Sequence, residues 1–320
     1  MINNIQVLRA FAAINVLVLH TIGSASSFNQ SVFFSNILSK WGNNGVDIFF
    51  VISGFLAIYI QYNNKKNSKQ IIVSKIARIV PLYWLINFTV ISLFLFYPNL
   101  FRELIITPLW ALSSLFFTSQ FLFESRPIVY LGWALEWEML FVIIFSTLII
   151  FKNEKIVYLL TTTSIILVSV ILNNFILLEF LFGMIVALIY QKKIISTKNA
   201  LYLLLIGIFF LLLSLNQDIV KINRVIIWGL PSAVILLASI NLNQLKNKTL
   251  IFVGNASYSI YLIQILTIPG FYKFSSIYLI NFNYEILFFI SIFLSLIFGV
   301  IVYNFIEKPI TSLIKKNYRH

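Results

Sequence analysis

Long runs of hydrophobic residues alternate with short polar segments along the whole sequence. A run of about 20 apolar residues lets an α-helix cross the hydrocarbon core of a bilayer. We therefore predict an all-α, polytopic integral membrane helical bundle. It forms one membrane-embedded domain, residues 1–320, with no appended soluble domain. The ten predicted spans are residues 5–23, 44–62, 76–97, 131–151, 156–172, 174–190, 199–215, 224–240, 250–268 and 284–306.

The basic residues predict the orientation of these spans. Of the 23 Lys and Arg residues, 16 belong to the segments after even-numbered spans or to the C-terminal tail, with Arg78 at the start of the third span counted in the segment before it. Six belong to the segments after odd-numbered spans, with Arg224 counted in the seventh loop. Because basic loops remain in the cytoplasm, both termini are expected there. Arg9 then lies near the cytoplasmic face and His20 toward the outer face.

Composition excludes several classes of function. Hydrophobic residues make up 60% of the chain and charged residues 10%. The formal net charge of +13 resides in short loops between apolar spans, so it does not predict nucleic-acid binding. The chain has no cysteine, which excludes disulfides, thiolate metal sites and cysteine nucleophiles. With one histidine inside a span, no metal is expected.

One connection is long. Residues 98–130 contain Trp110, a Phe-rich stretch over 115–123, and Arg126-Pro127. The segment is too apolar for a solvated loop, and its apolar run is too short to span a membrane. We interpret it as an interfacial or re-entrant segment that could cover a site.

Two ionisable residues are expected on one face of the first span. Arg9 and His20 are separated by ten residues. Eleven helical steps turn about 1100° and rise about 16 Å, so the two side chains lie on nearly the same face. Ionisable groups within a bilayer are costly and usually face a functional cavity. This pair is the strongest indication of function in the sequence.

The second span begins with Asn44, Gly45, Val46 and Asp47. Asp47 is either a functional acid at the outer end of this span or a first-turn charge that suits the helix dipole. Gly54, farther along, is expected to let helices pack closely.

The third span has a basic start. Lys75 and Arg78 are either cytoplasmic membrane anchors or, with Arg9, a cationic cluster for a phosphate-bearing ligand. Pro81 is expected to interrupt or open the helix.

Two carboxylates lie near the start of the fourth span. Glu136 and Glu138 are two residues apart and therefore point about 200° away from each other. One is expected to face a cavity and the other a headgroup or loop. A carboxylate in the outer part of a span needs a partner, and His20 is expected at similar depth. That pair would orient the imidazole; a purely structural ion pair is the alternative.

The ninth span carries a polar stripe. Ser257, Tyr261 and Gln264 follow one another at spacings of four and three, so they share a helix face. The stripe either lines a cavity or holds helices together by hydrogen bonds.

Taken together, these motifs resemble the acyltransferase 3 family of bacterial integral-membrane acyltransferases. The matching motifs occur in the family's order from the first span to the last: Arg9 with His20, Gly45-Val46-Asp47, Phe49-Phe50, Ser53-Gly54-Phe55, Arg78, Pro81-Leu82-Tyr83-Trp84, Trp133-x-Leu135-x-x-Glu138, Ser257-Tyr258-Ser259-Ile260-Tyr261-Leu262 and Glu307-Lys308-Pro309.

The resemblance implies O-acetyltransfer, usually from acetyl-CoA to a hydroxyl of a surface or envelope glycan such as O-antigen or exopolysaccharide. It maps the family's essential Arg and His onto Arg9 and His20, and its fourth-span Glu onto Glu138. Two positions depart from the family: Gln264 stands where many relatives have His, and Val142 where Tyr is common.

We expect acyl-CoA to bind from the cytoplasm through Arg9, Lys75 and Arg78. His20, oriented by Glu138 or Asp47, then removes a proton from the hydroxyl of a lipid-linked or polymeric glycan. Ser53 or Tyr261 could stabilise the oxyanion, and an acyl-histidine intermediate is a variant. The residues expected to line the substrate cavity are Asn44, Ser53, Tyr83, Trp84, Trp133, Ser257, Tyr261 and Gln264.

Two other interpretations remain. A transporter or flippase of a lipid-linked glycan would also bury charges, but we find no internal repeat and no matched pair of broken helices. A structural or sensory membrane protein would leave the alignment of Arg9 with His20 unexplained. The expected location is the bacterial inner membrane, among its lipids.

Overall fold

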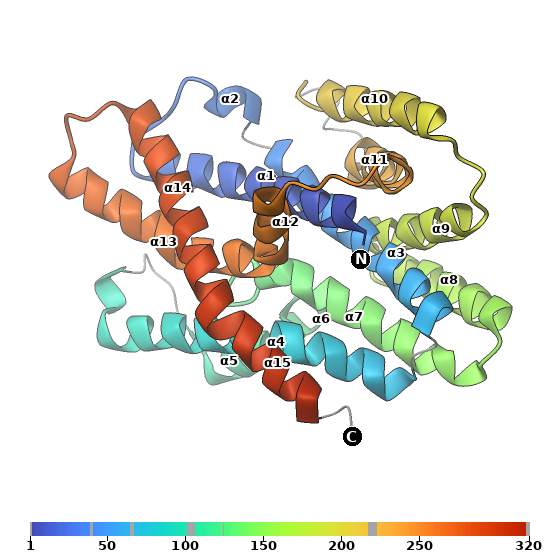
Figure 1. Ribbon diagram of the computed structural model, residues 1–320. Coiled ribbons are helices and arrows are strands. Elements are labelled where there is room, and N and C mark those ends of the chain that lie inside the picture. The colour runs from blue at the N-terminus through green and yellow to red at the C-terminus, as the bar shows by residue number, and fades with distance from the viewer. Residues whose placement is uncertain are drawn as a thin grey trace. The chain divides into compact units, whose positions relative to one another are not determined.

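The structure is a computed structural model that describes residues 2–38, 41–64, 67–100, 106–123, 125–216 and 223–317. Within these residues the chain is helical and contains no strand, as predicted (Figure 1). It forms two compact units, residues 1–66 with 158–300 and residues 67–157 with 301–320.

The first unit contains the helix that carries Arg9 and His20. Its elements are α1 (Asn3–Ser27), α2 (Ser35–Leu38), η1 (Trp41–Asn43), α3 (Asn44–Asn64), α8 (Glu154–Ile171), η4 (Phe175–Leu177), α9 (Leu178–Gln191), α10 (Thr197–Leu213), η6 (Val225–Gly229), α11 (Leu230–Asn241), α12 (Lys248–Asn255), α13 (Ser257–Tyr278) and α14 (Tyr284–Val302).

Close backbone contacts hold the first unit together. A Cβ atom on Gly54 of α3 would overlap the carbonyl oxygen of Phe180, and one on Gly183 of α9 would overlap that of Val51. The two helices therefore cross with their backbones almost touching, which only glycine permits. The expected role of Gly54 is confirmed.

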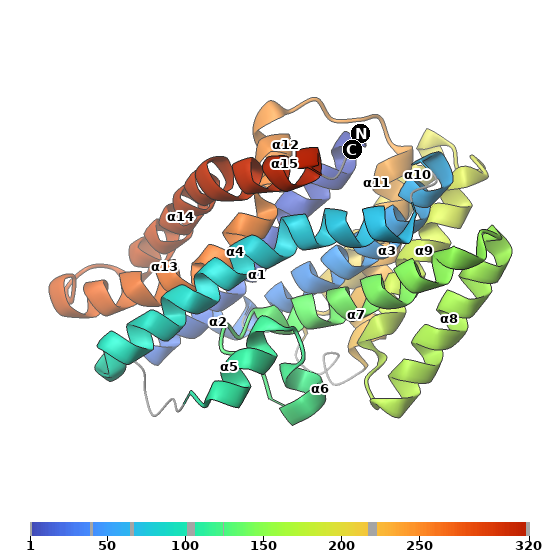
Figure 2. The same cartoon turned by 90° about the horizontal axis from the view of Figure 1, so that it is seen from below.

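The second unit is built around two long antiparallel helices, α4 (Ser68–Phe96) and α7 (Gly132–Leu148), which lie side by side in Figure 2. Asn67 caps α4 in a reciprocal capping box with Gln70. The remaining elements are η2 (Pro98–Leu100), α5 (Pro108–Leu115), α6 (Ser119–Phe123), η3 (Ile149–Phe151), η7 (Tyr303–Glu307) and α15 (Lys308–Asn317).

Pro81 does not interrupt α4, contrary to our expectation. The helix continues from Ser68 to Phe96 with Pro81 inside it. Apolar helices tolerate an internal proline when neighbouring groups compensate for the lost backbone hydrogen bond.

Each predicted span coincides with helix, but the count of ten stays a prediction. Among the described residues, six helices are long and apolar enough to cross a membrane. A seventh span results if α12 and α13, bent by 65° at their junction, are counted together. Three shorter apolar helices cover 175–191, 197–213 and 225–241. The orientation of the termini and the single membrane domain also stay predictions.

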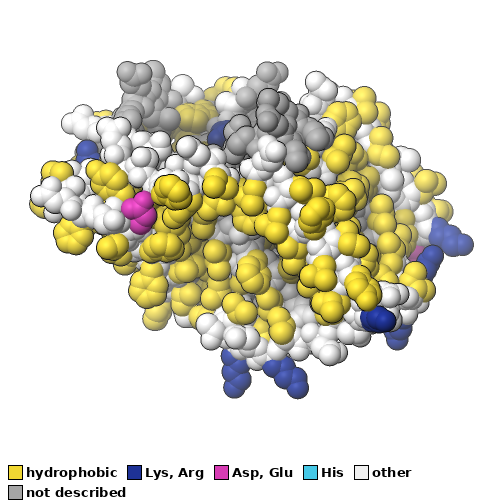
Figure 3. Space-filling view, turned by 90° about the horizontal axis from the view of Figure 1, so that it is seen from above, with side chains coloured by type: hydrophobic (Ala, Val, Ile, Leu, Met, Phe, Trp, Pro, Cys, Tyr) yellow, Lys and Arg dark blue, Asp and Glu magenta, His cyan; other side chains and the backbone are white. Residues whose placement is uncertain are grey.

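The surface agrees with a membrane protein. In the face shown in Figure 3, hydrophobic side chains predominate and Lys and Arg lie mostly at the edges. Exposed large apolar residues include Phe209 of α10 and Phe293 of α14, which are 58% and 64% exposed. Such surface is unfavourable in water and normal against lipid tails.

The long connection folds into the short helices α5 and α6, neither of which is long enough to span a bilayer. Residues 101–105 and 124 lie outside the described residues. Glu136 of α7 holds this segment: it is fully buried and accepts hydrogen bonds from the backbone N–H groups of Ser119 and Gln120 and from the Gln120 side chain, at 2.9–3.0 Å. Of the two carboxylates near the start of α7, Glu136 thus faces the loop.

Replacing Glu136 should loosen this segment. In Glu136→Ala, the buried N–H of Ser119 loses its acceptor, which costs about 1–3 kcal/mol. We expect a lower thermal unfolding temperature in detergent and faster proteolysis within residues 106–123. The control is Glu154→Ala, because Glu154 is exposed. Equal proteolysis of both variants would show that Glu136 does not hold this segment in place.

Candidate functional site

Arg9 and His20 both lie on α1, a single uninterrupted helix. Glycines let the neighbouring elements approach α1 closely. A Cβ on Gly45 of α3 would overlap the carbonyl oxygen of Ala12, and one on Gly254 of α12 would overlap that of Gln6. The position of the Arg9 and His20 backbone is therefore set by backbone packing against α3 and α12.

Arg9 is 8% exposed and contacts neutral groups. Its Nη2 donates to Ser257 Oγ at 2.9 Å and its Nη1 to Gln6 Oε1 at 3.2 Å. No carboxylate of the described part of the chain lies within ion-pair distance of this guanidinium. Ser257 is the first residue of α13, directly after the bend between α12 and α13. A buried cation thus lies beside the positive end of a helix dipole, which makes the place suitable for an anion.

The polar stripe of α13 faces inward. Ser257, Tyr261 and Gln264 are 0%, 5% and 1% exposed. Ser257 binds Arg9, Tyr261 packs edge-on against Phe49 of α3 at 6.4 Å between ring centroids, and Gln264 Nε2 donates to the carbonyl oxygen of Tyr261 at 2.8 Å. The sequence predicted this shared face but not its contact with Arg9.

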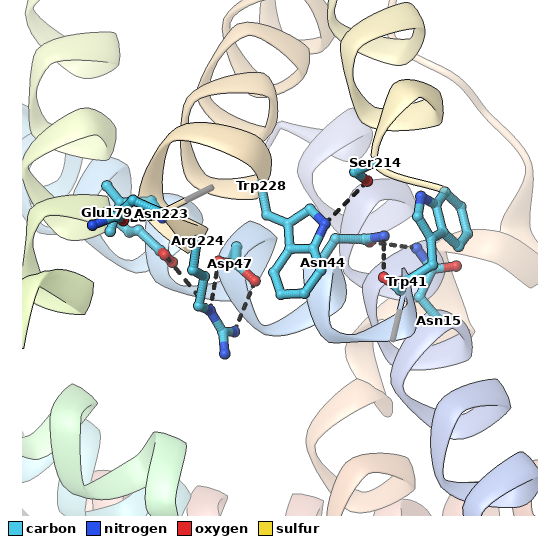
Figure 4. Close-up of polar contacts among 10 residues, drawn as sticks. Asn15, Trp41, Asn44, Asp47, Glu179, Ser214, Asn223, Arg224 and Trp228 are labelled. Carbon is cyan, nitrogen blue, oxygen red and sulfur yellow. Dashed lines mark hydrogen bonds and ion pairs between the residues drawn. The ribbon is translucent and has the colours of Figure 1, made fainter. Parts of the chain in front are cut away.

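Asp47 is fully buried in the first turn of α3, where Arg224 engages both of its carboxylate oxygens (Figure 4). Arg224 Nε donates to Oδ1 at 3.0 Å and Nη2 to Oδ2 at 2.8 Å. Glu179 of α9 lies beside them, with Oε1 4.0 Å from Arg224 Nε. Glu179 is fully buried, and neither of its oxygens has a hydrogen-bond partner among the described residues.

Sequence reasoning missed Arg224 and Glu179. Arg224 was assigned to a loop, yet it directly precedes the π-helical turn η6 (Val225–Gly229), a form that often marks functional sites. Gly229 of that turn leaves room for Glu179, because a Cβ there would lie 2.9 Å from Glu179 Cγ. An acid in the first turn of an apolar helix was the available signal.

Asn44 links α1 to α3 and is fully buried. It accepts a hydrogen bond from Asn15 Nδ2 at 2.8 Å and donates to the carbonyl oxygen of Trp41 (Figure 4). Asn15 lies between Arg9 and His20 on α1. Both ends of the Asn44 amide are thus occupied, so its observed role is to position α1.

In the second unit, the predicted cationic residues are paired with acids. Lys75 Nζ lies 2.5 Å from Glu138 Oε1, and Arg78 Nε lies 3.8 Å from Glu307 Oε1. Our expectation placed Lys75 and Glu138 at opposite membrane faces. The correction follows from where α7 begins: a Cβ on Gly132 would overlap Tyr83, near the middle of α4. Two turns into α7, Glu138 is therefore level with Lys75.

Two aromatic residues predicted to line the substrate cavity make hydrogen bonds to α5. Tyr83 is fully buried and its hydroxyl donates to the carbonyl oxygen of Ser114 at 3.1 Å. Trp84 Nε1 donates to the carbonyl oxygen of Leu115 at 2.9 Å. Trp133 is half-buried, and its carbonyl oxygen accepts a hydrogen bond from Gln120.

Ser53 and His20 are half-buried within α3 and α1. Across the residues that the structure describes, no group of three His, Cys, Asp or Glu side chains is placed to hold a metal ion.

Comparison with known proteins decides the family. A family profile described as an acyltransferase domain, acyltransferase 3, matches residues 2–304. The chain belongs to the acyltransferase 3 family. The chain is also similar to the exopolysaccharide production protein ExoZ of Rhizobium meliloti (strain 1021), with 38% identity over 108 residues. This match covers 33% of each chain, so the chain aligns with about one third of that relative's length. No solved structure gives a significant match.

In this acyltransferase 3 chain, the ion pair between Asp47 and Arg224 can be tested by mutation. In Arg224→Gln, two buried carboxylates lose their shared cation, and removing one partner of a buried ion pair costs about 3–5 kcal/mol. We expect a marked drop in thermal unfolding temperature in detergent. Lys273→Gln, which changes an exposed lysine, should leave that temperature unchanged.

A double-mutant cycle completes this test. Asp47→Asn combined with Arg224→Gln should cost less than the sum of the two single changes, because the residues are in direct contact. Strictly additive effects would show that the pair does not couple α3 to η6.

Proposed function

We propose that this protein is a membrane O-acyltransferase that moves an acetyl or other short acyl group from cytoplasmic acyl-CoA to a hydroxyl of an envelope or surface polysaccharide, such as O-antigen or exopolysaccharide. The family supports acyl transfer, and the apolar helices support a membrane location. The name of the similar Rhizobium protein, which concerns exopolysaccharide production, supports the class of acceptor. The proposed location is the inner membrane, with both termini in the cytoplasm.

The observation that carries the proposal is the environment of Arg9. A buried guanidinium with neutral hydrogen-bond partners lies beside the start of α13, and no described carboxylate is within ion-pair distance of it. The phosphates of CoA would supply the missing negative charge, since guanidinium binds phosphate through paired hydrogen bonds. Arg9 therefore serves as the donor's phosphate anchor.

His20 serves as the general base. One of its ring nitrogens takes the proton of the glycan hydroxyl while that oxygen attacks the thioester carbonyl carbon. The tetrahedral intermediate then collapses and the carbon–sulfur bond breaks. The imidazolium gives its proton to the CoA thiolate that leaves. Along α1, Arg9 and His20 are separated by a rise of about 16 Å, about half the hydrocarbon core, which lets a cytoplasmic donor reach an outward acceptor.

The other charged residues that the sequence predicted to take part in the reaction already have ion-pair partners. Asp47 already binds Arg224, so it would have to share that cation in order to orient His20, and Glu138 is paired with Lys75 in the second unit. Lys75 and Arg78 are each paired with a carboxylate of their own unit, Glu138 and Glu307, so either would have to exchange that carboxylate in order to bind a phosphate. Arg9 needs no such exchange.

One observation keeps the flippase alternative in view. The bend of 65° between α12 and α13 makes a broken span of the kind used by transporters. Transporters of that kind carry such breaks in matched pairs, and the described residues contain one. A flippase would transfer no acyl group, so labelled acetyl-CoA separates the two functions.

Removing the imidazole should abolish acyl transfer. We expect His20→Ala to lower incorporation of label from acetyl-CoA into membrane glycan by at least about 10²-fold, the usual contribution of general base catalysis, while protein levels stay normal. Mass spectrometry of the surface polysaccharide should show the acyl group lost.

The matched control is His320→Ala, which removes the other histidine of the chain. It should retain full transfer. Wild-type acylation in His20→Ala, or no labelled glycan from the wild-type protein, would refute the proposed function.

A further inference from the structure

Gln264 has an acceptor atom without a donor. Its side chain is 1% exposed, and its Oε1 has no hydrogen-bond partner among the described residues. The orientation of the amide is fixed, because Nε2 faces the carbonyl oxygen of Tyr261, which can only accept. A buried polar atom left unpaired costs about 1–3 kcal/mol. Such an atom needs a partner from outside the described side chains, such as an ordered water, an ion or a ligand.

This acceptor lies in line with the site at Arg9. Gln264 follows Ser257 by seven residues, which is two helical turns, so both side chains lie on nearly the same face of α13. The rise between them is about 10 Å. One face of the helix therefore presents the guanidinium-bound Ser257 first and an unpaired carbonyl oxygen farther along.

Two contacts show that α13 and α1 run in parallel. Arg9 meets Ser257 at one end. At the other end, Phe28 stacks on Tyr272 with 6.4 Å between ring centroids. Gln264 lies between these two contacts, about 10 Å from Ser257, whereas His20 lies about 16 Å from Arg9 along α1. Measured from Arg9 along α1 and α13, the order is the Arg9 cation, the Gln264 acceptor atom and the His20 imidazole.

We propose that Gln264 Oε1 accepts a hydrogen bond from an amide N–H of the pantetheine arm of the acyl-CoA donor. This inference rests on the proposed function, in which Arg9 holds the donor's phosphates and His20 serves the thioester. The pantetheine arm carries two secondary amides between its phosphates and its sulfur. The donor's own order of phosphate, amide and thioester therefore matches the order of Arg9, Gln264 and His20.

The chemistry of the side chain agrees with this assignment. An amide N–H can only donate, and the atom of Gln264 that lacks a partner is the acceptor Oε1, while its NH₂ group donates to the carbonyl oxygen of Tyr261. A hydroxyl of the acceptor glycan could also donate this hydrogen bond. Gln264, however, shares its face of α13 with Ser257, which binds the proposed phosphate anchor Arg9. We therefore assign the hydrogen bond to acyl-CoA, and the binding test distinguishes this donor from the glycan.

The test measures binding, so it does not depend on catalysis. Full-length protein in lipid nanodiscs is titrated with CoA and with 3′-phosphoadenosine 5′-diphosphate, which is the nucleotide part of CoA without the arm. Gln264→Met should weaken CoA binding about tenfold, the value of one good hydrogen bond, and leave binding of the nucleotide unchanged. Arg9→Gln should weaken binding of both probes.

The matched control is Thr267→Val on the same helix. Its hydroxyl is already paired with Ser295 at 2.8 Å, so CoA binding should not change. A second measurement needs no variant: two CoA analogues, each with one arm amide replaced by an ester, lack one N–H. The wild-type protein should bind one of them about tenfold more weakly than CoA.

The outcomes separate this inference from the proposed function. If wild-type protein binds CoA, and neither Gln264→Met nor either ester analogue lowers the affinity, the assignment of Gln264 is wrong and the donor site stands. A loss in Gln264→Met confined to the acceptor glycan would also overturn the assignment. If the wild-type protein binds neither probe, the donor site at Arg9 falls, and this inference falls with it.

Discussion

A cation buried without a carboxylate is the constraint on which the proposed chemistry depends. Removing an isolated ion from water costs several kcal/mol, and a helix dipole of the same sign adds to that cost. Elsewhere in the described residues, Lys75, Arg78 and Arg224 each meet an acid. Arg9 meets Gln6 and Ser257, and α13 begins beside it. The favourable partner for such a place is an anion from outside the chain, and a phosphate matches the guanidinium in both charge and geometry.

The packing of the neighbouring helices holds α1, and with it Arg9, in a fixed position. Gly45 and Gly254 allow α3 and α12 to lie directly on the backbone of α1, and Asn15 is bound to Asn44. Packing at this distance leaves α1 little freedom to rotate or slide, since interiors are close-packed and respond to small shifts. Asp47, two residues after Gly45, is in turn fixed by Arg224. Rigidity of this kind preorganises a binding group before its ligand arrives.

Sequence reasoning recovered features that depend on helical period and could not recover those that depend on helix neighbours. The shared face of Ser257 and Gln264, the alignment of Arg9 with His20, and the divergence of Glu136 from Glu138 all follow from 3.6 residues per turn. Lys75 with Glu138 was missed because we assumed that every span starts at a membrane face, whereas α7 starts beside Tyr83 in the middle of α4. Arg224 was missed because no periodicity shows that a residue beside a loop will turn inward to Asp47.

In the proposed function, the bend between α12 and α13 lets one helix contact two different parts of the donor. A continuous helix would carry its dipole through this point, so no helix would begin beside Arg9. The bend at Ala256 instead starts a new helix at Ser257, inside the unit, where the positive helix end adds to the guanidinium. Beyond the first turn that field falls off, and the face of α13 becomes neutral and hydrogen-bonding at Gln264. On the proposed assignment, the same segment changes from anion binding to amide recognition within two turns, which is the order of groups in a nucleotide-linked thioester.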